Sequence, residues 1–366
     1  HAYLFSDIHV GYQACREIVQ AVKPSIVRLF DEAETVSIIK KIIGFEKRGS
    51  FLNLTLEGYE KVVAAELEIV LDIAKKYGAQ LIYEVHDLWP LSPMELGGMS
   101  KYHPFIVGMQ IAENACYRHS DYVVSLLPCA KEHMVEHGMN PDKFVCIPNG
   151  INREDWEQPA EPESAPYHEK LRQYHEEGWF LIGYAGAHGL ANALDSYVEA
   201  GKELEGKKIK LILVGRGPER ERLCRKIKEL GLQENVEALP AVAKDDVPAL
   251  LAQFDALYVG LQRQPLFRFG VSPNKLMDYM MAGKPVIFAI EAGNDMVADA
   301  GCGVSIPPED SHAIAEAAVK LAGTPAEERE AMGARGHAYI LEKHEYGVLS
   351  EQFREVFRRG KFPGNR

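Results

Sequence analysis

FGVSPNKLMDYMMAGKPVIF, residues 269–288, decides the fold that we expect for this chain of 366 residues. A Ser-Pro pair at 272–273 suits the start of a helix, because Ser caps first turns and Pro fits the first helical position. Lys275 and Asp278 follow three residues apart, and hence on one face of that helix. Ala-Gly-Lys-Pro at 282–285 ends the helix before an apolar segment of strand length. The stretch therefore predicts a helix that presents a lysine and an acid to a ligand, followed by a buried strand.

Strand-like and helix-like segments alternate on both sides of this stretch. From about residue 80 onward, short apolar runs such as YVVSLL (122–127), WFLIGYAG (179–186) and KIKLILVG (208–215) are each followed by a segment with helical spacing. Such alternation predicts parallel strands joined by crossover helices. The second half holds about six such strands, which predicts a complete doubly wound unit.

The first 78 residues follow a different order, strand-helix-strand-strand-helix, which predicts a small α+β segment. This βαββα segment would be ferredoxin-like if the next strand completes it. Residues 152–178 are rich in Glu and Pro, which is typical of a linker that leads into a polar helix.

Three glycine- or cap-bearing turns follow strands of the second half. The first is the loop Gly186–Gly189, the second places Arg216 between two glycines, and the third is the Ser272 turn. Glycines let the backbone approach a phosphate, and helix starts offer free N–H groups. Since all three turns come at strand ends of one sheet, we expect them to surround one ligand. We expect Asp278 to accept hydrogen bonds from ribose hydroxyls.

Each of these features also has an ordinary structural explanation. The glycine loops are also typical of plain strand-to-helix turns, and Lys275 with Asp278 would also form a local ion pair worth a few tenths of a kcal/mol. Met277, Met280 and Met281 are more typical of core packing than of a ligand surface. The three turns together favour the ligand site over these alternatives.

Composition and charge exclude several classes of protein. The net charge of −12 argues against electrostatic binding of nucleic acid. The six cysteines are scattered without a C-x-x-C pair, which predicts reduced, mostly buried thiols and no zinc site. Residues 1–10 lack the basic segment of a signal peptide, and no apolar run approaches the ~20 residues that span a bilayer. We therefore expect a cytoplasmic protein.

Residues from about 80 to 358 resemble the retaining glycosyltransferases of family 4. The matching stretches are VHDLWP, DYVVSLLP, IPNGI, YAGAHGLANAL, VGRGPE, SPNKLMDYMMAGKPVI and AGCGVSIPPED. The resemblance is strongest to the bacterial branch that builds surface polysaccharide. It implies an α/β chain of the GT-B fold, with two Rossmann-like halves of which the N-terminal one is abbreviated.

The resemblance also implies roles for individual residues. The Gly186–Gly189 loop with His188, together with Arg216 and Lys275, matches the diphosphate-binding elements, and Ser272 and Asn274 belong to the same donor site. Asp278 stands where the family binds the ribose, usually with Glu, and Gly270 stands where many members carry a second acid. His86 matches a histidine that faces the donor sugar, although a structural role is equally compatible with its position. Asp87 is a candidate hydrogen-bond partner for His86 or for the acceptor.

The N-terminal part departs from this family. PSIVRLFDEAET and LTLEGYEKVVAAELEIVLDIAKKYGA resemble the cap domain of an FAD-linked oxidase of the alkyl-dihydroxyacetone-phosphate synthase type. This suggests a chimera joined near residues 78–80, with a divergent Rossmann half as the alternative. No flavin-phosphate loop is visible, so we expect no bound flavin.

These expectations define domains and competing functions. The expected domains are an α+β segment at 1–78, the rest of the acceptor half at 79–155, a linker at 156–178, a nucleotide-sugar-binding domain at 179–340 and closing helices at 341–366. The expected function is front-face transfer with retention from a nucleotide sugar, most plausibly a UDP-sugar, to a glycan or lipid-linked acceptor. It needs no metal or cofactor, and it allows a peripheral contact at the inner face of the membrane. The competing hypotheses are a scaffold that binds the donor without transfer, a GT-B epimerase and a flavoenzyme fragment.

Overall fold

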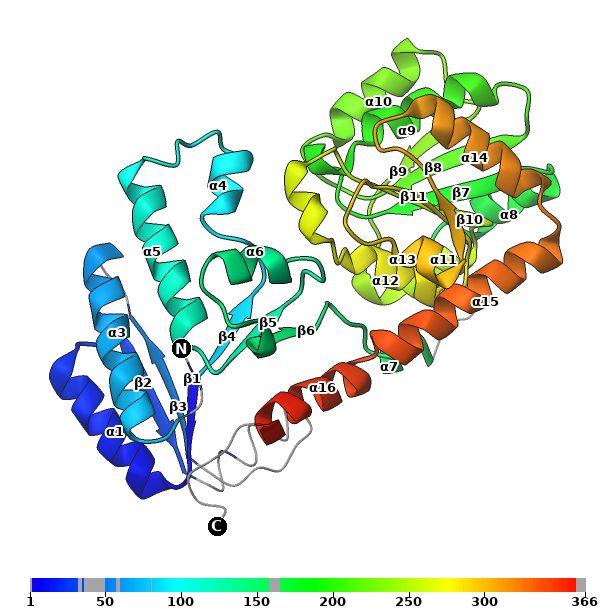
Figure 1. Ribbon diagram of the computed structural model, residues 1–366. Helices are drawn as coiled ribbons and strands as arrows, with labels where there is room; N and C mark the ends of the chain where they lie inside the picture. Colours follow the sequence, from blue (N-terminus) through cyan, green and yellow to red (C-terminus); the bar gives the residue numbers. More distant parts are fainter. Residues whose placement is uncertain are drawn as a thin grey trace. The chain divides into compact units, whose positions relative to one another are not determined.

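The computed structural model describes residues 2–31, 35, 50–56, 60–79, 81–157 and 165–359. The chain divides into two compact units, one formed by His1–Pro148 with Leu349–Arg366 and the other by Asn149–Val348. Figure 1 labels the helices and strands of both units.

The second unit is built on a six-stranded parallel sheet with the strand order β12-β11-β10-β7-β8-β9. The strands are β7 (Phe180–Ala185), β8 (Ile209–Val214), β9 (Val236–Leu239), β10 (Ala256–Gly260), β11 (Val286–Ala289) and β12 (Gly303–Ser305). The chain proceeds outward from β7 to β9 and then returns to pair β10 with β7. Ligands of such doubly wound sheets bind beyond the carboxyl ends of the strands, near this reversal.

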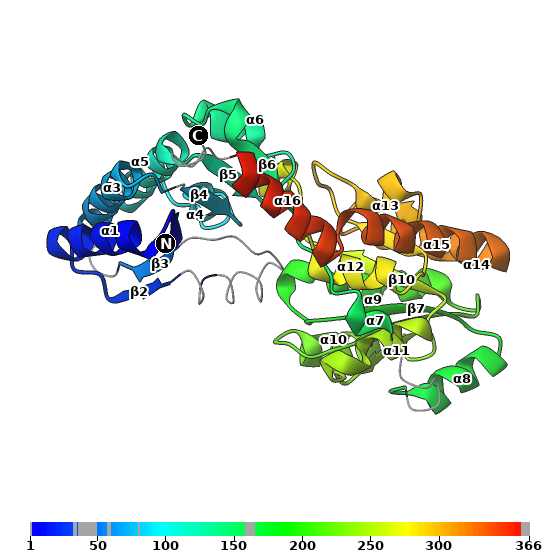
Figure 2. The same cartoon turned by 90° about the horizontal axis from the view of Figure 1, so that it is seen from below.

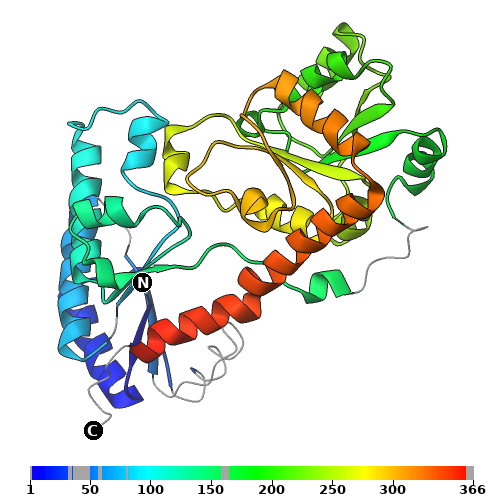
Figure 3. The ribbon, with the colours of Figure 1, turned by 45° about the vertical axis from the view of Figure 1, so that its right-hand side comes forward.

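Helices cover both faces of this sheet (Figure 1). They are α8 (His168–Glu176), α9 (Leu194–Ala200), α10 (Arg220–Glu229), α11 (Val247–Ala252), α12 (Asn274–Met281), α13 (Met296–Ala300), α14 (Ser311–Gly323) and α15 (Ala326–Lys343). Single turns lie at η3 (Leu190–Asn192), η4 (Gly201–Leu204), η5 (Lys244–Asp246) and η6 (Pro265–Phe269), and the short α7 (Glu154–Glu157) precedes them. Helix α15 packs on α12 and α13, as the orange and yellow segments of Figure 3 show.

The near-continuous apolar strands of this unit produce two cores. Successive side chains of a strand point to opposite faces, so a strand buried on both sides needs apolar residues throughout. Leu181 belongs to the core under α8, α11, α12, α13 and α15, whereas the next residue, Ile182, belongs to the core under α9, α10 and α14. The predicted doubly wound unit of about six strands is therefore confirmed.

The first unit contains two three-stranded sheets. Strands β1 (Ala2–Phe5), β3 (Ser50–Thr55) and β2 (Ile26–Phe30) form an antiparallel sheet in that order, while β4 (Ile82–Val85), β5 (Tyr122–Ser125) and β6 (Phe144–Cys146) form a parallel one. Helices α1 (Ile8–Ala21) and α3 (Glu60–Lys76) lie next to each other and bury the apolar face of the antiparallel sheet (Figure 2). The remaining elements are α4 (Leu91–Glu95), α5 (Pro104–His119), α6 (Lys131–Glu136), η1 (Pro141–Lys143) and α16 (Tyr346–Arg359), the last of which begins in the second unit.

The elements β1, α1, β2, β3 and α3 follow one another among the described residues, with 32–34 and 36–49 between β2 and β3 outside them, and the next strand does not complete a ferredoxin-like arrangement. Strand β4 pairs with β5 through four residue pairs that begin at Ile82–Tyr122. Asp121 fixes this placement, because its Oδ2 accepts the Leu81 N–H at 2.8 Å while its own N–H donates to the Leu81 carbonyl. These two hydrogen bonds therefore hold β4 beside β5 in the parallel sheet.

Parts of the predicted N-terminal segment lie outside the described residues. These parts are 32–34 of PSIVRLFDEAET, 57–59 of the following stretch and Gln80 at the expected join. Residues 158–164 of the expected linker also lie outside them, whereas the polar helix that was predicted after the linker is α8.

Candidate functional site

A cavity of about 730 Å³ lies at the carboxyl ends of β7, β8 and β9. Its wall is formed by residues from the turns after these three strands and from the first turns of α12. They are Ala185, Gly186, Ala187, Val214, Gly215, Arg216, Gly217, Ala241, Val242, Val247, Asn274, Lys275 and Asp278. The turns after β7 and β8 and the start of α12, which are far apart in the sequence, therefore meet at one cavity.

The two glycine turns are hydrogen-bonded to each other. The His188 N–H donates to the Arg216 carbonyl at 2.8 Å, and the His188 carbonyl accepts the Glu219 N–H at 3.0 Å. A Cβ on Gly215 would come within 1.9 Å of the Gly186 carbonyl oxygen. Glycine is thus required at position 215, because the backbones of the two turns touch there. Without side chains, the glycines also leave the backbone of both turns open to the cavity.

Tyr279 ties α12 to the end of β7. Its buried hydroxyl accepts the Ala185 N–H at 2.8 Å and donates to the Ala185 carbonyl at 3.0 Å. Both polar groups of a cavity-lining residue are therefore satisfied by one side chain. This contact brings the first turns of α12 to the cavity.

Lys275 lies in the cavity wall with an unusual set of neutral partners. Its Nζ donates to the Tyr184 hydroxyl at 2.9 Å and to Asn192 Oδ1, and it lies 4.7 Å from the centre of the Tyr184 ring. Burial lowers the pKa of Lys275 to about 8. No carboxylate neutralises this ammonium in the described part of the chain, so it is available to an anionic ligand.

Asp278 lies one turn further along α12, at the same cavity. Burial raises the pKa of its carboxyl to about 6, and Lys244 partly opposes this effect while Asp155 adds to it. Within the described ranges, neither a hydrogen bond nor an ion pair reaches this carboxylate. Since half-buried carboxylates are costly without partners, the geometry suits a ligand that donates hydrogen bonds.

His188 is fully buried behind the glycine turns. Neither ring nitrogen has a hydrogen-bond partner among the described residues, and Nε2 would lie 2.9 Å from a Cβ on Gly215. Burial, then the charges of Arg220 and Lys275, lower the pKa of His188 to about 4. The imidazole is therefore neutral near pH 7, and it lies behind the cavity wall, not in it.

Arg216 and Asn274 line the cavity with exposed side chains, whereas Gly189 and Ser272 do not line it. The expected cap by Ser272 is wrong: α12 starts after Pro273 without a side-chain cap. The Ser272 hydroxyl instead accepts the Asn149 N–H at 3.0 Å, and Asn149 Nδ2 donates to the Ser272 carbonyl at 2.7 Å. Ser272 is thus engaged by the segment that precedes the linker.

Gly270, the position of the second acid in many relatives, has a φ of 96°, which disfavours any side chain. The adjacent Val271 is clamped on both sides by Asn294, whose Oδ1 accepts the Val271 N–H at 2.7 Å. A glutamate at 270 would strain this backbone.

His86 and Asp87 follow β4 in the first unit and are exposed. His86 Nε2 lies 3.1 Å from Glu84 Oε1. The proposed bond between His86 and Asp87 is not found, because Glu84, on the same side of the chain, takes that place. Their roles in transfer stay predictions.

Sequence reasoning missed three residues of the cavity's support, Tyr184, Asn192 and Tyr279. All three lie within stretches that resemble the family, but each acts through a contact with a residue more than eighty positions away. Their polar atoms within otherwise apolar segments were the one available signal.

Other candidate chemistry is not supported by the described residues. No three His, Cys, Asp or Glu side chains there lie together as a metal site requires. None of the six cysteines forms a disulfide in the structure, but only Cys302 is buried and the others are half-buried, which corrects the expectation of mostly buried thiols. None of the helices in those ranges has the length and apolar character to cross a membrane.

Comparisons with known proteins agree with this geometry. Residues 180–324, less than half of the chain, match the family model described as "Glycosyl transferases group 1". The matched residues all lie within the second unit. A search of curated protein sequences gave no match.

Several solved structures share the fold. HepE from Anabaena, crystallised with UDP and glucose, is 18% identical and aligns over 82% of this chain and 76% of its own, with a TM-score of 0.60. Sucrose-phosphate synthase from Thermosynechococcus elongatus is 17% identical over 83% and 80%, with a TM-score of 0.58. WaaG, a glycosyltransferase of lipopolysaccharide biosynthesis, is 19% identical over 84% and 85%, with a TM-score of 0.55. The chain therefore has an α/β fold of the GT-B class, consistent with two Rossmann-like halves.

Proposed function

We propose that this chain is a glycosyltransferase that moves a sugar from a nucleotide sugar, a UDP-sugar in particular, to a glycan or lipid-linked acceptor. The observation that carries the proposal is the cavity of the second unit. There, an ammonium and a carboxylate that have no ionic partner among the described residues line one space together with two glycine turns.

Each part of a nucleoside diphosphate has a complementary group in this wall. Lys275 and Arg216 supply positive charge for the diphosphate, and the glycine turns let the ligand approach the backbone. Asp278, three residues along the same helix, would accept hydrogen bonds from the ribose hydroxyls. Ala241, Val242 and Val247 form an apolar side suited to a base.

The chemistry that we propose is electrostatic. Transfer leaves a diphosphate with developing negative charge, which Lys275 and Arg216 would stabilise without reorganising. The diphosphate would assist deprotonation of the acceptor hydroxyl, so the sugar would be transferred from the front face with retention. No flavin, metal or other cofactor forms part of the proposal.

The match to the group 1 glycosyltransferase model supports sugar transfer, and the UDP in the HepE crystals supports the choice of nucleotide. The involvement of WaaG in lipopolysaccharide biosynthesis supports a surface polysaccharide as the product. His86 and Asp87 are proposed to act near the acceptor, on the basis of the family resemblance alone. We also propose that the chain acts at the inner face of the membrane.

A second function is favoured by the first unit. Its parallel sheet contains three strands among the described residues, and the segment before it is antiparallel. A chimeric scaffold that retains donor binding but lacks transfer would have this construction. The resemblance of residues 24–35 and 54–79 to an oxidase cap is part of this alternative.

Two measurements separate these functions. Titration calorimetry with UDP, with GDP as the comparison, should show saturable binding of UDP. A donor-hydrolysis assay with UDP-glucose and UDP-N-acetylglucosamine then tests turnover. Binding with turnover supports the transferase, binding without turnover supports the scaffold, and the absence of binding to either nucleotide contradicts both.

A further inference from the structure

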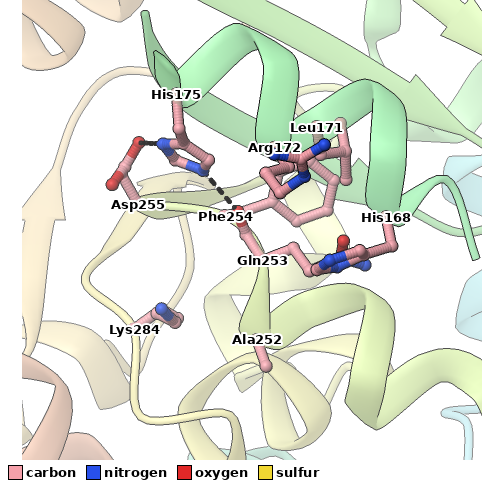
Figure 4. Close-up of a pocket in the computed structure, with 9 residues that line it drawn as sticks. All are labelled: His168, Leu171, Arg172, His175, Ala252, Gln253, Phe254, Asp255 and Lys284. Atoms are coloured by element: carbon pink, nitrogen blue, oxygen red, sulfur yellow. Dashed lines mark hydrogen bonds and ion pairs between the residues drawn. The ribbon is translucent and has the colours of Figure 1, made fainter. Parts of the chain in front are cut away.

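A second cavity lies in the same unit, at the amino ends of the parallel strands and therefore opposite the first cavity. It has a volume of about 240 Å³ and is formed around the residues that precede β10 and β11 and along one side of α8. The lining residues are His168, Leu171, Arg172, His175, Ala252, Gln253, Phe254, Asp255 and Lys284, as Figure 4 shows. The first cavity lies beyond the carboxyl ends of the strands, so the two share no residue.

One side of this cavity is held by a hydrogen-bonded frame. Asp255 Oδ2 accepts the Leu181 N–H at 2.7 Å and lies 3.8 Å from His175 Nδ1. His175 Nε2 must carry a proton, because it lies 3.0 Å from the Gln253 carbonyl, which can only accept. Figure 4 draws the contacts of His175 with Asp255 and with the Gln253 carbonyl, and the hydrogen bond that engages the Asp255 carboxylate comes from the Leu181 N–H.

The other polar groups of the wall are less well satisfied. Arg172 pairs with Glu169 and Glu176 on its own helix. No hydrogen bond or ion pair reaches the side chains of Lys284 and His168 in the ranges that the structure describes. The wall therefore presents an ammonium and an imidazole without partners.

Lys284 is held in place by its backbone. It follows Gly283, and a Cβ on Gly333 of α15 would come 1.8 Å from the Gly283 carbonyl oxygen. This close packing fixes the turn from which the lysine extends. Burial lowers the pKa of Lys284 and the charge of Arg329 adds to this effect, whereas the carboxylates of Asp255 and Glu330 oppose it. A half-buried ammonium without a direct partner is costly, and an oxyanion would offset that cost.

We propose that this cavity binds a small oxyanion of the phosphate type, with Lys284 as its charge partner and His168 as a second donor. Arg172 is already paired with Glu169 and Glu176, and Asp255 accepts the Leu181 N–H, so Lys284 is the cation of this wall that lacks a direct carboxylate partner among the described residues. The volume admits a phosphate group and excludes a nucleotide, which needs a larger cavity such as the first. The inference does not rest on the proposed transferase function.

Calorimetry with inorganic phosphate at constant ionic strength tests this site. All proteins carry Lys275→Met, so that the first cavity lacks its ammonium. Lys284→Met should weaken phosphate binding about tenfold or more, the effect of losing one charged hydrogen bond, and His168→Gln about threefold. The matched control, Lys202→Met, removes an exposed lysine of the same unit and should leave phosphate binding unchanged. A parallel titration with glucose 6-phosphate distinguishes a phosphorylated sugar from the free ion.

Two results would overturn the proposal. One is the absence of saturable phosphate binding to the parent protein, and the other is equal binding by the Lys284→Met and Lys202→Met variants. If Lys284→Met does not fold, the His168→Gln variant tests the proposal instead. An unchanged phosphate affinity of His168→Gln would contradict phosphate binding in this cavity.

Discussion

The Nζ atom of Lys275 lies 2.9 Å from the hydroxyl of Tyr184, although the two residues are 91 positions apart. The hydroxyl in turn donates to the Ala187 carbonyl at 2.6 Å. Helix α12 and the turn after β7 are thus joined through one hydroxyl at the cavity wall. This contact places the ammonium beside the glycine turn that is proposed to hold a diphosphate.

Replacing Lys275 should weaken UDP binding. We expect Lys275→Met to cost about 1.5–3 kcal/mol, the range for a hydrogen bond to a charged group. Because the lysine has a pKa of about 8, its positive charge is lost as the pH rises through 8, and wild-type affinity should fall there. Bound diphosphate itself raises the pKa of Lys275, so the decline in UDP affinity begins at a higher pH. Lys275→Arg, measured by calorimetry between pH 7 and 9, should show no such decline, and an equal decline in both proteins would contradict this role.

Asp278 should contribute to UDP affinity through the ribose. Asp278→Ala should weaken UDP binding by about 1–3 kcal/mol, since hydrogen bonds to a carboxylate are lost. Glu229→Ala, at an exposed position of α10, is the control and should bind like the wild type. An unchanged dissociation constant in Asp278→Ala would remove Asp278 from the site.

The stability of the unliganded protein should carry two opposite pH dependences. The pKa of Asp278 is raised to about 6, so its stabilising contribution is present below about pH 4 and is lost as the pH rises through 6. The pKa of His188 is lowered to about 4, so its contribution is present above 6.5 and is lost as the pH falls through 4. Each amounts to about 3 kcal/mol at most, from shifts of roughly two units.

Single variants should separate these contributions. From pH 4 to 6.5, the unfolding free energy of Asp278→Asn should rise relative to wild type, and that of His188→Phe should fall. Urea unfolding at several pH values measures both slopes. Parallel curves for all three proteins would show that neither group titrates differently in the folded state.

Gly215 should tolerate no side chain. Gly215→Ala would push the Gly186 carbonyl aside, costing on the order of 1–3 kcal/mol of stability and most of the UDP affinity. Gly323→Ala, where nothing lies within 4 Å of the added Cβ, should change stability by no more than about 1 kcal/mol. Thermal unfolding and UDP titration of both variants check this, and equal behaviour would mean that the two turns do not touch.

Ser272 should affect stability more than binding. Ser272→Ala leaves the Asn149 N–H without its acceptor and should cost about 1 kcal/mol of unfolding free energy. The UDP affinity should remain close to that of wild type, because the hydroxyl is not part of the cavity wall. A loss of UDP affinity as large as in Asp278→Ala would contradict this prediction and would show that Ser272 contributes to the donor site.

Much of the second unit was predictable from local pattern. The helix-breaking Ala-Gly-Lys-Pro and the apolar runs place α12 and β11 within two residues of their observed bounds. The three turns were also predictable as one site, because parallel strands carry their carboxyl ends to the same edge. The cap by Ser272 and the pairing of β4 were not, since each depends on a partner outside its own segment.

By itself, the sequence determined the elements, the order of the doubly wound unit and the residue types around the cavity, because hydrophobic period and turn chemistry act over a few residues. Only the tertiary structure decided that Lys275 donates to Tyr184, that Ser272 accepts from Asn149 and that Lys284 lines a second cavity with no hydrogen-bond or ion-pair partner in the described ranges. Hydrogen bonds and burial join residues from distant parts of the chain, so the chemical state of each side chain follows from contacts that no local pattern contains.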